Sequence, residues 1–258
     1  MHALTRSAIF VALLARSVFP VCAQESPTLS KGDCTAPAPA KDLRHCAFSG
    51  LARPGLDLHG ALLDGVALDN ANLANCNLRG ASLRGSNLKW ANVAGCDLRE
   101  ADLGGADLFH ATFNQADMSK ASLKDANLFG AFLDSVVAVG ADFSGAHLKD
   151  VSIEASNLSG ASFDRCYMFR AVLIGSNLAG AKVREAVLTG ASLESVDFRG
   201  ADLRGSLLNG ATLDGTEWEG ATLTDARFVN AKLAGANFAG ARDVPEHLGA
   251  LLAGTAGR

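Results

Sequence analysis

A period of five residues runs without insertion or deletion from Leu56 to Gly240 and constrains this chain more than any other feature. Thirty-seven consecutive units keep one register, and the third position of every unit is apolar. A small residue opens each unit, Ala in twenty-four of them, and Gly closes twenty. Because a period of five fits neither the 3.6-residue face of a helix nor the alternation of a strand, the pattern predicts a repeat architecture.

The apolar third positions form the expected core. One five-residue unit cannot bury its own apolar residue, so the units must stack and share a core along their length. The small opening positions are the second inward column of this core. The frequent closing Gly predicts a corner in every unit, where the absence of a Cβ makes a positive φ least strained.

The sequence resembles the pentapeptide repeat family, whose motif A-(D/N)-L-x-x occurs several times in this chain. The motif begins at Ala71, Ala101, Ala106, Ala126 and Ala201. The resemblance implies an all-β fold, a right-handed quadrilateral parallel β-helix with four units per coil and about nine coils. Residues twenty apart would then lie above one another, about 4.8 Å apart. The resemblance implies no single function.

Residues 1–23 do not join the repeat and predict a secretory signal peptide. Arg6 precedes an apolar run over 8–15, and small residues allow cleavage after Ala23. Lipidation of Cys22 is the alternative, although the residues before it fit a lipobox poorly. The apolar run is too short for a membrane span. The sequence therefore predicts a periplasmic or secreted protein.

The segments that flank the repeat are expected to differ from it. Residues 24–45 are rich in Pro and Ala and predict a flexible leader. The repeat domain is expected over 46–240, with an irregular first coil where Arg53 takes a centre position. Asp243 ends the repeat, and a short capping helix is expected within 241–258. Three apolar residues would either cover the last coil or form a homodimer contact: Leu248, Leu251 and Leu252.

The cysteines fall into two groups. Cys34 and Cys46 lie outside the regular repeat, and a disulfide between them would tie the leader to the first coil; two unbridged cysteines are the alternative. His45 is adjacent, but two Cys and one His at this spacing form no recognised set of metal ligands. Cys76 and Cys96 are inward residues one coil apart, where parallel side chains seldom reach disulfide geometry.

The sequence contains no recognisable catalytic motif. It has no nucleophile elbow, no Gly-rich phosphate loop, no HExxH and no paired CxxC. A straight rod also offers few concavities in which catalytic groups could converge. We therefore expect no catalytic residues, no metal site and no cofactor.

One outward face differs from the polar composition of the others when the chain is folded in twenties. Phe109, Phe129 and Phe169 share a column that Lys149 interrupts. Exposed aromatic rings beside basic and His side chains are typical of a protein-binding patch. The alternative is that stacked rings only reinforce the sheet. The expected patch, termed here the aromatic ridge, consists of Trp90, Phe109, His110, Phe129, Tyr167, Phe169, Arg170 and Leu207.

The charge of the chain limits the class of partner. The formal net charge is −4, and loss of the two arginines in the expected signal peptide would make it modestly more acidic. Such a charge disfavours a nucleic-acid partner. The sequence thus predicts an exported, non-enzymatic scaffold that binds an unidentified protein. The family resemblance implies an alternative, a DNA-mimicking inhibitor or protector of DNA gyrase, if the N-terminal segment is not an export signal.

Overall fold

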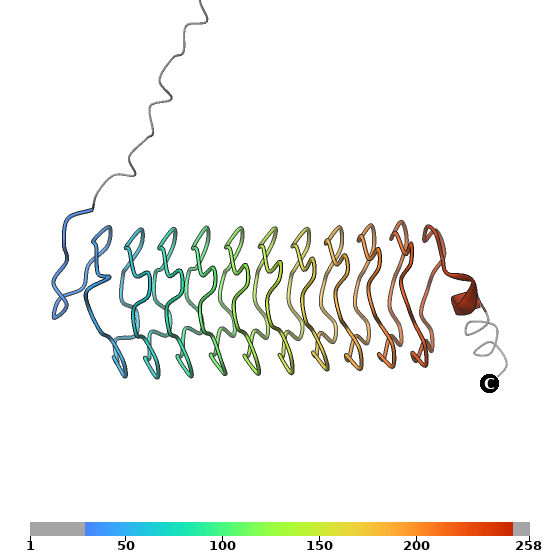
Figure 1. The fold of residues 1–258 in the computed structure, drawn as a ribbon, viewed down its shortest axis with the longest axis horizontal. Coiled ribbons are helices and arrows are strands. Elements are labelled where there is room, and N and C mark those ends of the chain that lie inside the picture. Colours follow the sequence, from blue (N-terminus) through green and yellow to red (C-terminus); the bar gives the residue numbers. More distant parts are fainter. Residues whose placement is uncertain (1–28, 250–258) are drawn as a thin grey trace, which may run out of the picture.

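The computed structural model describes residues 29–249, which form a straight rod of stacked four-sided coils (Figure 1). From 42 to 222, every fifth residue makes a parallel bridge to the residue twenty positions further on, as Asp102 does to Ser122. Each side of a coil contributes one bridge residue and a two-residue turn rather than an extended strand. The one helix in the described part of the chain spans 246–249. The repeat architecture predicted from the period of five is confirmed, as is the four-sided parallel coil that the resemblance implies.

Four backbone hydrogen bonds recur in the repeated units. The amide of Asp102 donates to the carbonyl of Ala81 in the preceding coil at 2.9 Å, and that of Leu103 donates to Ser122 in the following coil at 2.7 Å. A third bond, from the amide of Ala106 to the carbonyl of Leu103 at 3.0 Å, closes the turn. In the fourth, the amide of the corner residue Gly105 donates to the carbonyl of Lys124 in the following coil at 2.8 Å. Interior coils are therefore paired on both sides, and unpaired edges can arise only at the two ends.

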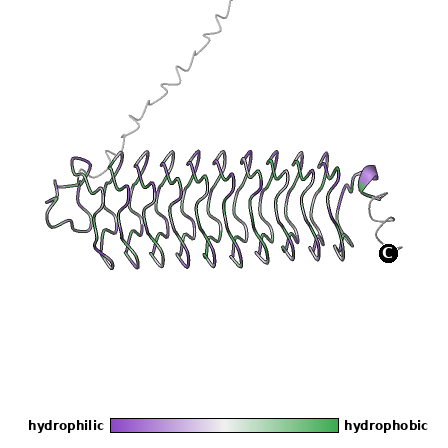
Figure 2. Ribbon diagram, turned by 90° about the horizontal axis from the view of Figure 1, so that it is seen from below, coloured by the Kyte–Doolittle hydropathy of each residue, from purple (hydrophilic) through white to green (hydrophobic). Residues whose placement is uncertain are grey.

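Both inward columns are buried as the sequence predicts. Every centre residue from Leu73 to Phe228 is 0–1% exposed. Apolar and polar residues alternate along each coil (Figure 2), as the period requires. Aromatic core residues stack at the coil spacing, and the ring centroids of Phe143 and Phe163 lie 4.8 Å apart. A fully buried Leu or Phe contributes roughly 1.5–3 kcal/mol, so the column of centre residues is the main source of stability.

Left-handed backbone at the corners is also confirmed. Every residue that closes a unit from 50 to 240 has a positive φ, whether it is Gly105 at 64° or Glu100 at 62°. A residue with a Cβ pays roughly 1–2 kcal/mol for this conformation. The repeat therefore tolerates other residues at the corner, but only Gly adopts the corner without strain.

The expectation of a flexible leader over 24–45 is wrong for its described part. The first repeated unit is 41–45, one unit earlier than expected, and its centre residue Leu43 is fully buried. Residues 29–40 lie against the open end of this first coil, where Lys31 bridges Asp42. The sequence did not indicate this unit because its first residue is Lys41 rather than a small residue. Lys is tolerated there because no preceding coil encloses that position at the end of the rod. We call 29–40 the N-terminal strap.

The irregular first coil expected around Arg53 is not observed. Residues 51–55 keep the same turn, and Ala52 makes the regular bridge to Asn72 in the following coil. The side chain of Arg53 is exposed, and its Nη2 donates to the carbonyl of Thr35 in the N-terminal strap at 3.2 Å. A polar centre residue is accommodated here because no further coil covers this edge.

The C-terminal cap forms as predicted, with one difference. Leu248 of the helix is fully buried against the end of the core, whereas Leu251 and Leu252 lie outside the described residues. The amide of Phe228 donates to Nε2 of His247 at 3.2 Å, in place of the carbonyl that a further coil would supply. Asp243 does not cap the helix; its carboxylate accepts from Oγ1 of Thr224 at 2.6 Å.

Candidate functional site

The repeat places the residues of the aromatic ridge along one face, because residues twenty apart lie one coil apart. Cys76 and Cys96 share such a column, and their Cα atoms are 4.6 Å apart. The structure joins them in a disulfide, although parallel side chains one coil apart were not expected to reach that geometry. The rings of Phe109 and Phe129 stack at this spacing, with centroids 5.4 Å apart and planes 8° apart. Ring stacking along the ridge is thus a direct consequence of the coil geometry.

Four residues form one aromatic cluster at the N-terminal part of the ridge. Trp90 meets Phe109 edge to face at 5.2 Å, and its ring lies parallel to His110 at 6.4 Å. His110 in turn packs edge to face on Phe109 at 4.4 Å and on Phe129 at 6.0 Å. Such pairs contribute roughly 0.5–1.5 kcal/mol beyond their buried area, so the cluster is held in place without a ligand.

A second cluster lies further along the same face. The rings of Tyr167 and Phe169 stack at 6.2 Å, and the guanidinium of Arg170 lies 5.5 Å above Phe169. Arg170 also donates two hydrogen bonds to Asp150, at 2.7 and 2.8 Å. These hydrogen bonds, opposed in part by burial, lower the pKa of Asp150. The carboxylate therefore stays ionised and holds Arg170 over the ring.

Lys149 lies between the two clusters. Its ammonium is 5.2 Å from the centroid of Phe129, and it makes no ion pair with any residue in the described part of the chain. Leu207 is more distant and joins the second cluster only through the column Tyr167, Val187 and Leu207. The structure thus brings four predicted ridge residues together, places three more in a second cluster, and leaves Leu207 near the end of the face.

The rings of the ridge are less exposed than the sequence indicates. Trp90 is 55% exposed, but the other aromatic side chains are half-buried because each ring covers a face of its neighbour. Exposed apolar residues also occur on other faces, outside the predicted patch, and include Phe132, Val137 and Val139. All three occupy outward positions that are polar in most units. Apolar residues at these positions could have identified the exposed residues from the sequence.

Trp90 combines high exposure with a strained backbone. It closes its unit with φ 53°, and it is the one large apolar residue with a positive φ among residues 29–249. Gly fills this position in most units, and a Cβ there costs roughly 1–2 kcal/mol. The aromatic contacts of Trp90 contribute a comparable stabilisation and so do no more than offset this strain. Folding alone therefore gives little reason to place Trp at this corner.

Gly130 provides a test of how the first cluster is held. A Cβ at Gly130 would lie 2.6 Å from the ring of His110, whereas one at Gly210, in the same column, would meet nothing within 4 Å. Both positions have a positive φ, so the strain of an added methyl is matched. We expect Gly130→Ala to lower the free energy of unfolding by about 1 kcal/mol more than Gly210→Ala, as for mild overpacking.

Urea unfolding of the two variants measures this difference, and the imidazole signals of His110 in NMR spectra report its displacement. Equal unfolding free energies together with unchanged His110 signals would contradict the packing described for this cluster.

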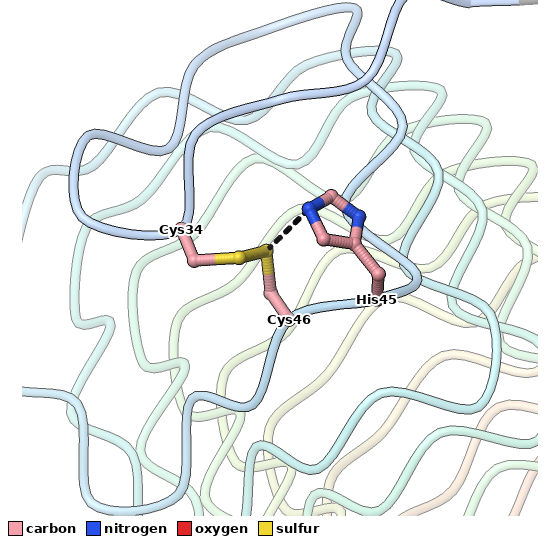
Figure 3. Close-up of side chains that lie close together, drawn as sticks. All are labelled: Cys34, His45 and Cys46. Atoms are coloured by element: carbon pink, nitrogen blue, oxygen red, sulfur yellow. Dashed lines mark hydrogen bonds between the residues drawn. A yellow bond between two sulfur atoms is a disulfide. The ribbon is translucent and has the colours of Figure 1, made fainter.

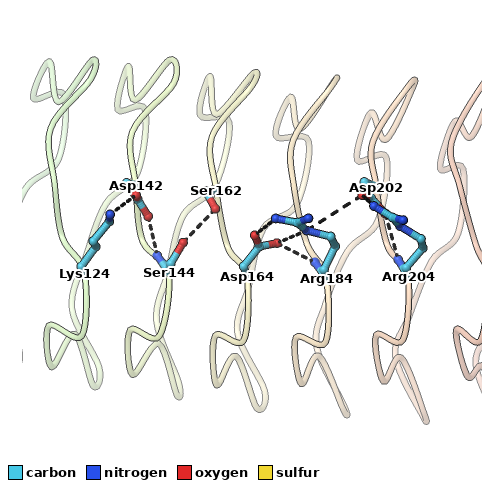
Figure 4. A network of polar contacts seen from close by, with 8 residues as sticks. All are labelled: Lys124, Asp142, Ser144, Ser162, Asp164, Arg184, Asp202 and Arg204. Carbon is cyan, nitrogen blue, oxygen red and sulfur yellow. Dashed lines mark hydrogen bonds and ion pairs between the residues drawn. The ribbon is translucent and has the colours of Figure 1, made fainter. Parts of the chain in front are cut away.

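A different face carries a ladder of paired charges (Figure 4). Lys124 pairs with Asp142 at 3.1 Å, and Arg204 pairs with Asp202 at 2.6 Å. Hydrogen bonds from Arg204, opposed in part by burial, lower the pKa of Asp202. The carboxylates drawn there are neutralised by neighbouring cations, so this face does not present a continuous array of unpaired acids.

Comparison with known proteins identifies the repeat. Eight copies described as "Pentapeptide repeats" match residues 55–89, 86–125, 126–165, 166–205 and 201–240, which is more than half of the chain. The chain belongs to the pentapeptide repeat family. Its fold is the right-handed quadrilateral β-helix of that family, as the resemblance implied. A comparison with curated proteins finds no significant match.

Two solved structures are similar to this chain, and the first of them supports the family assignment. HetL, a pentapeptide repeat protein involved in heterocyst differentiation regulation in the cyanobacterium Nostoc, is 31% identical, with a TM-score of 0.57 over 76% of this chain and 88% of HetL. A trypsin-treated form of QnrB1, a plasmid-mediated fluoroquinolone resistance protein, is 22% identical, with a TM-score of 0.46 over 80% of this chain and 98% of QnrB1.

Within residues 29–249, no helix is long and apolar enough to cross a membrane.

Proposed function

We propose that this pentapeptide repeat protein is an exported, non-enzymatic scaffold whose aromatic ridge binds a protein partner. The observation that carries the proposal is Trp90, a large exposed side chain held in a conformation that favours Gly. Strained residues that folding does not require often mark functional sites. Trp is also the residue type most enriched among the side chains that dominate binding energy at protein interfaces.

The surroundings of Trp90 fit a protein interface better than a catalytic site. The ridge is a row of rings with the cations of Lys149 and Arg170 over two of them, and interfaces are enriched in aromatic residues and Arg. The rings of Phe109 and Phe129 cover one another, so they present edges rather than open faces to a partner. This arrangement suits apolar side chains of a protein better than stacked nucleic-acid bases.

Export is supported by the cysteines at the N-terminal end. Cys34 and Cys46 are bonded in the structure, and disulfides persist mainly in oxidising compartments. The expected signal peptide, 1–23, lies outside the described residues, as does Cys22. A periplasmic or secreted location is therefore part of the proposal.

The alternative function is the inhibition or protection of DNA gyrase by imitation of DNA. That role favours a rod with a large excess of unpaired carboxylates. The modest net charge of −4 and the apolar character of the ridge favour the protein-binding scaffold instead.

Fractionation of cells that express the full chain with a C-terminal tag tests the proposed location. We expect a shortened protein outside the cytoplasm whose N-terminus is Gln24, as established by N-terminal sequencing. An intact chain retained in the cytoplasm would contradict export. Protection of gyrase supercoiling from a quinolone by the purified retained chain would then support the alternative.

A further inference from the structure

We propose that Cys34, His45 and Cys46 form a redox-controlled binding site for Zn²⁺, which is closed when the two cysteines are joined and open when they are reduced. The sequence spacing gave no recognised ligand set, but the fold brings the three residues together (Figure 3). Their ligand atoms all lie within 4.8 Å of one another. No other group of three or more His, Cys, Asp and Glu side chains in the described part of the chain converges in this way.

The backbone at His45 differs from the rest of the repeat. All unit-closing residues from 50 to 240 have a positive φ, whereas His45, which closes the first unit, does not. Nε2 of His45 lies 3.7 Å from Sγ of Cys46. The unusual backbone conformation of His45 thus occurs together with an imidazole ring that points at the sulfur of Cys46. An ordinary corner of the repeat needs no such ring orientation.

The set of donors suits zinc. Two thiolates and one imidazole bind Zn²⁺ in proteins and leave a fourth position for water. The nearest carboxylate on the same unit, that of Asp42, is held by Arg44 through two hydrogen bonds of 2.7 and 2.9 Å. Asp42 is therefore not counted as a ligand, and the site has three protein ligands.

The two ends of the site remain close after reduction. Cys46 belongs to the first coil, and its amide donates to the carbonyl of Leu43 at 2.9 Å. Cys34 belongs to the N-terminal strap, which the bridge between Lys31 and Asp42 also fastens to that coil. Loss of the disulfide therefore leaves Cys34 near His45, so little chain entropy opposes metal binding.

The disulfide and the metal exclude one another. A dithiol reductant supplies two electrons and two protons, the bond between Cys34 and Cys46 breaks, and the reductant becomes a disulfide. Zn²⁺ then displaces the two thiol protons, and neutral His45 adds a lone pair. Exchange with a small-molecule disulfide reverses these steps. The sulfur atoms of Cys34 and Cys46 rejoin, the small-molecule disulfide is reduced to two thiolates, and Zn²⁺ leaves.

Titration of the full chain with Co²⁺ tests the proposal. The other four cysteines are replaced by Ala, so that Cys34 and Cys46 are the only cysteines: Cys22, Cys76, Cys96 and Cys166. Ala is the usual residue of the inward column to which the last three belong. After reduction by a phosphine that is then removed, we expect one Co²⁺ per chain with a thiolate charge-transfer band, displaced by Zn²⁺. The oxidised chain should bind none.

His45→Gln should weaken Co²⁺ binding by more than the roughly 10–100-fold that loss of an outer-shell partner costs. His59→Gln is the matched control, because His59 is an exposed histidine that contacts Asp57 rather than sulfur. Trypsin cleavage after Lys31 supplies a second readout, since Zn²⁺ should slow cleavage of the reduced chain and not of its Cys34→Ser variant.

Three results would overturn the site. These are a reduced chain without the charge-transfer band, equal Co²⁺ binding by the oxidised and reduced chains, and a His45→Gln variant that binds Co²⁺ as tightly as its parent.

Discussion

Leu103→Asp should destabilise the rod by more than about 5 kcal/mol, the largest loss that we expect from a single substitution. Leu103 occupies a centre position of an interior coil and is fully buried. The change removes its packing, which costs roughly 2–5 kcal/mol, and buries a carboxylate in a core that offers no cation. Because each coil rests on its neighbours, the damage should spread to adjacent coils. Thermal and urea unfolding followed by circular dichroism measure the loss.

Asp102→Asn is the matched control for this substitution. Oδ1 of Asp102 accepts a hydrogen bond from the amide of Gly104 at 2.9 Å, and an Asn side chain can keep that bond. The ion pair of Asp102 with Arg84 is exposed and contributes little. We expect a change below about 1 kcal/mol. Similar losses in the Leu103 and Asp102 variants would show that the assignment of inward and outward positions is wrong.

Trp90→Gly should abolish or greatly weaken partner binding while the free energy of unfolding changes by less than about 1 kcal/mol. Relief of the positive φ at this corner gains roughly 1–2 kcal/mol, and loss of the aromatic contacts costs a comparable amount. Capture of proteins by the immobilised chain from an extracytoplasmic extract, followed by titration with the purified partner, measures the affinity. A structural Trp would give the opposite pattern, with lower stability and unchanged affinity.

Replacement of Phe109, Phe129 and Phe169 by Ser extends the test to the whole ridge. The control is the triple replacement by Ser of three exposed apolar residues on other faces: Phe132, Val137 and Val139. We expect the ridge variant to lose the partner and the control variant to keep it, with the β-helix spectrum present in both. Retention of every partner by the ridge variant would assign the rings a structural role.

Much of the fold follows from the period of five. The centre and opening columns and the corners could be predicted because each repeats in unit after unit. The stacking of residues twenty apart, such as Phe109 on Phe129, followed from the four units per coil that the family resemblance implies. Leu43 and Arg53 were interpreted wrongly, since both lie at the end of the rod. At an end, a position is covered on one side only, and the rules that hold for interior coils no longer decide which residues fit.

The sequence by itself determined the repeat, the inward columns, the composition of the aromatic ridge and the absence of catalytic motifs. Only the tertiary structure decided how far the rings are buried, because the exposure of Phe129 depends on the rings and the Lys149 ammonium stacked around it. It also decided the convergence of Cys34, His45 and Cys46, since that depends on where the N-terminal strap lies. A periodic sequence specifies neighbours within the period, whereas contacts made by non-repeating segments depend on the shape of the surface that they meet.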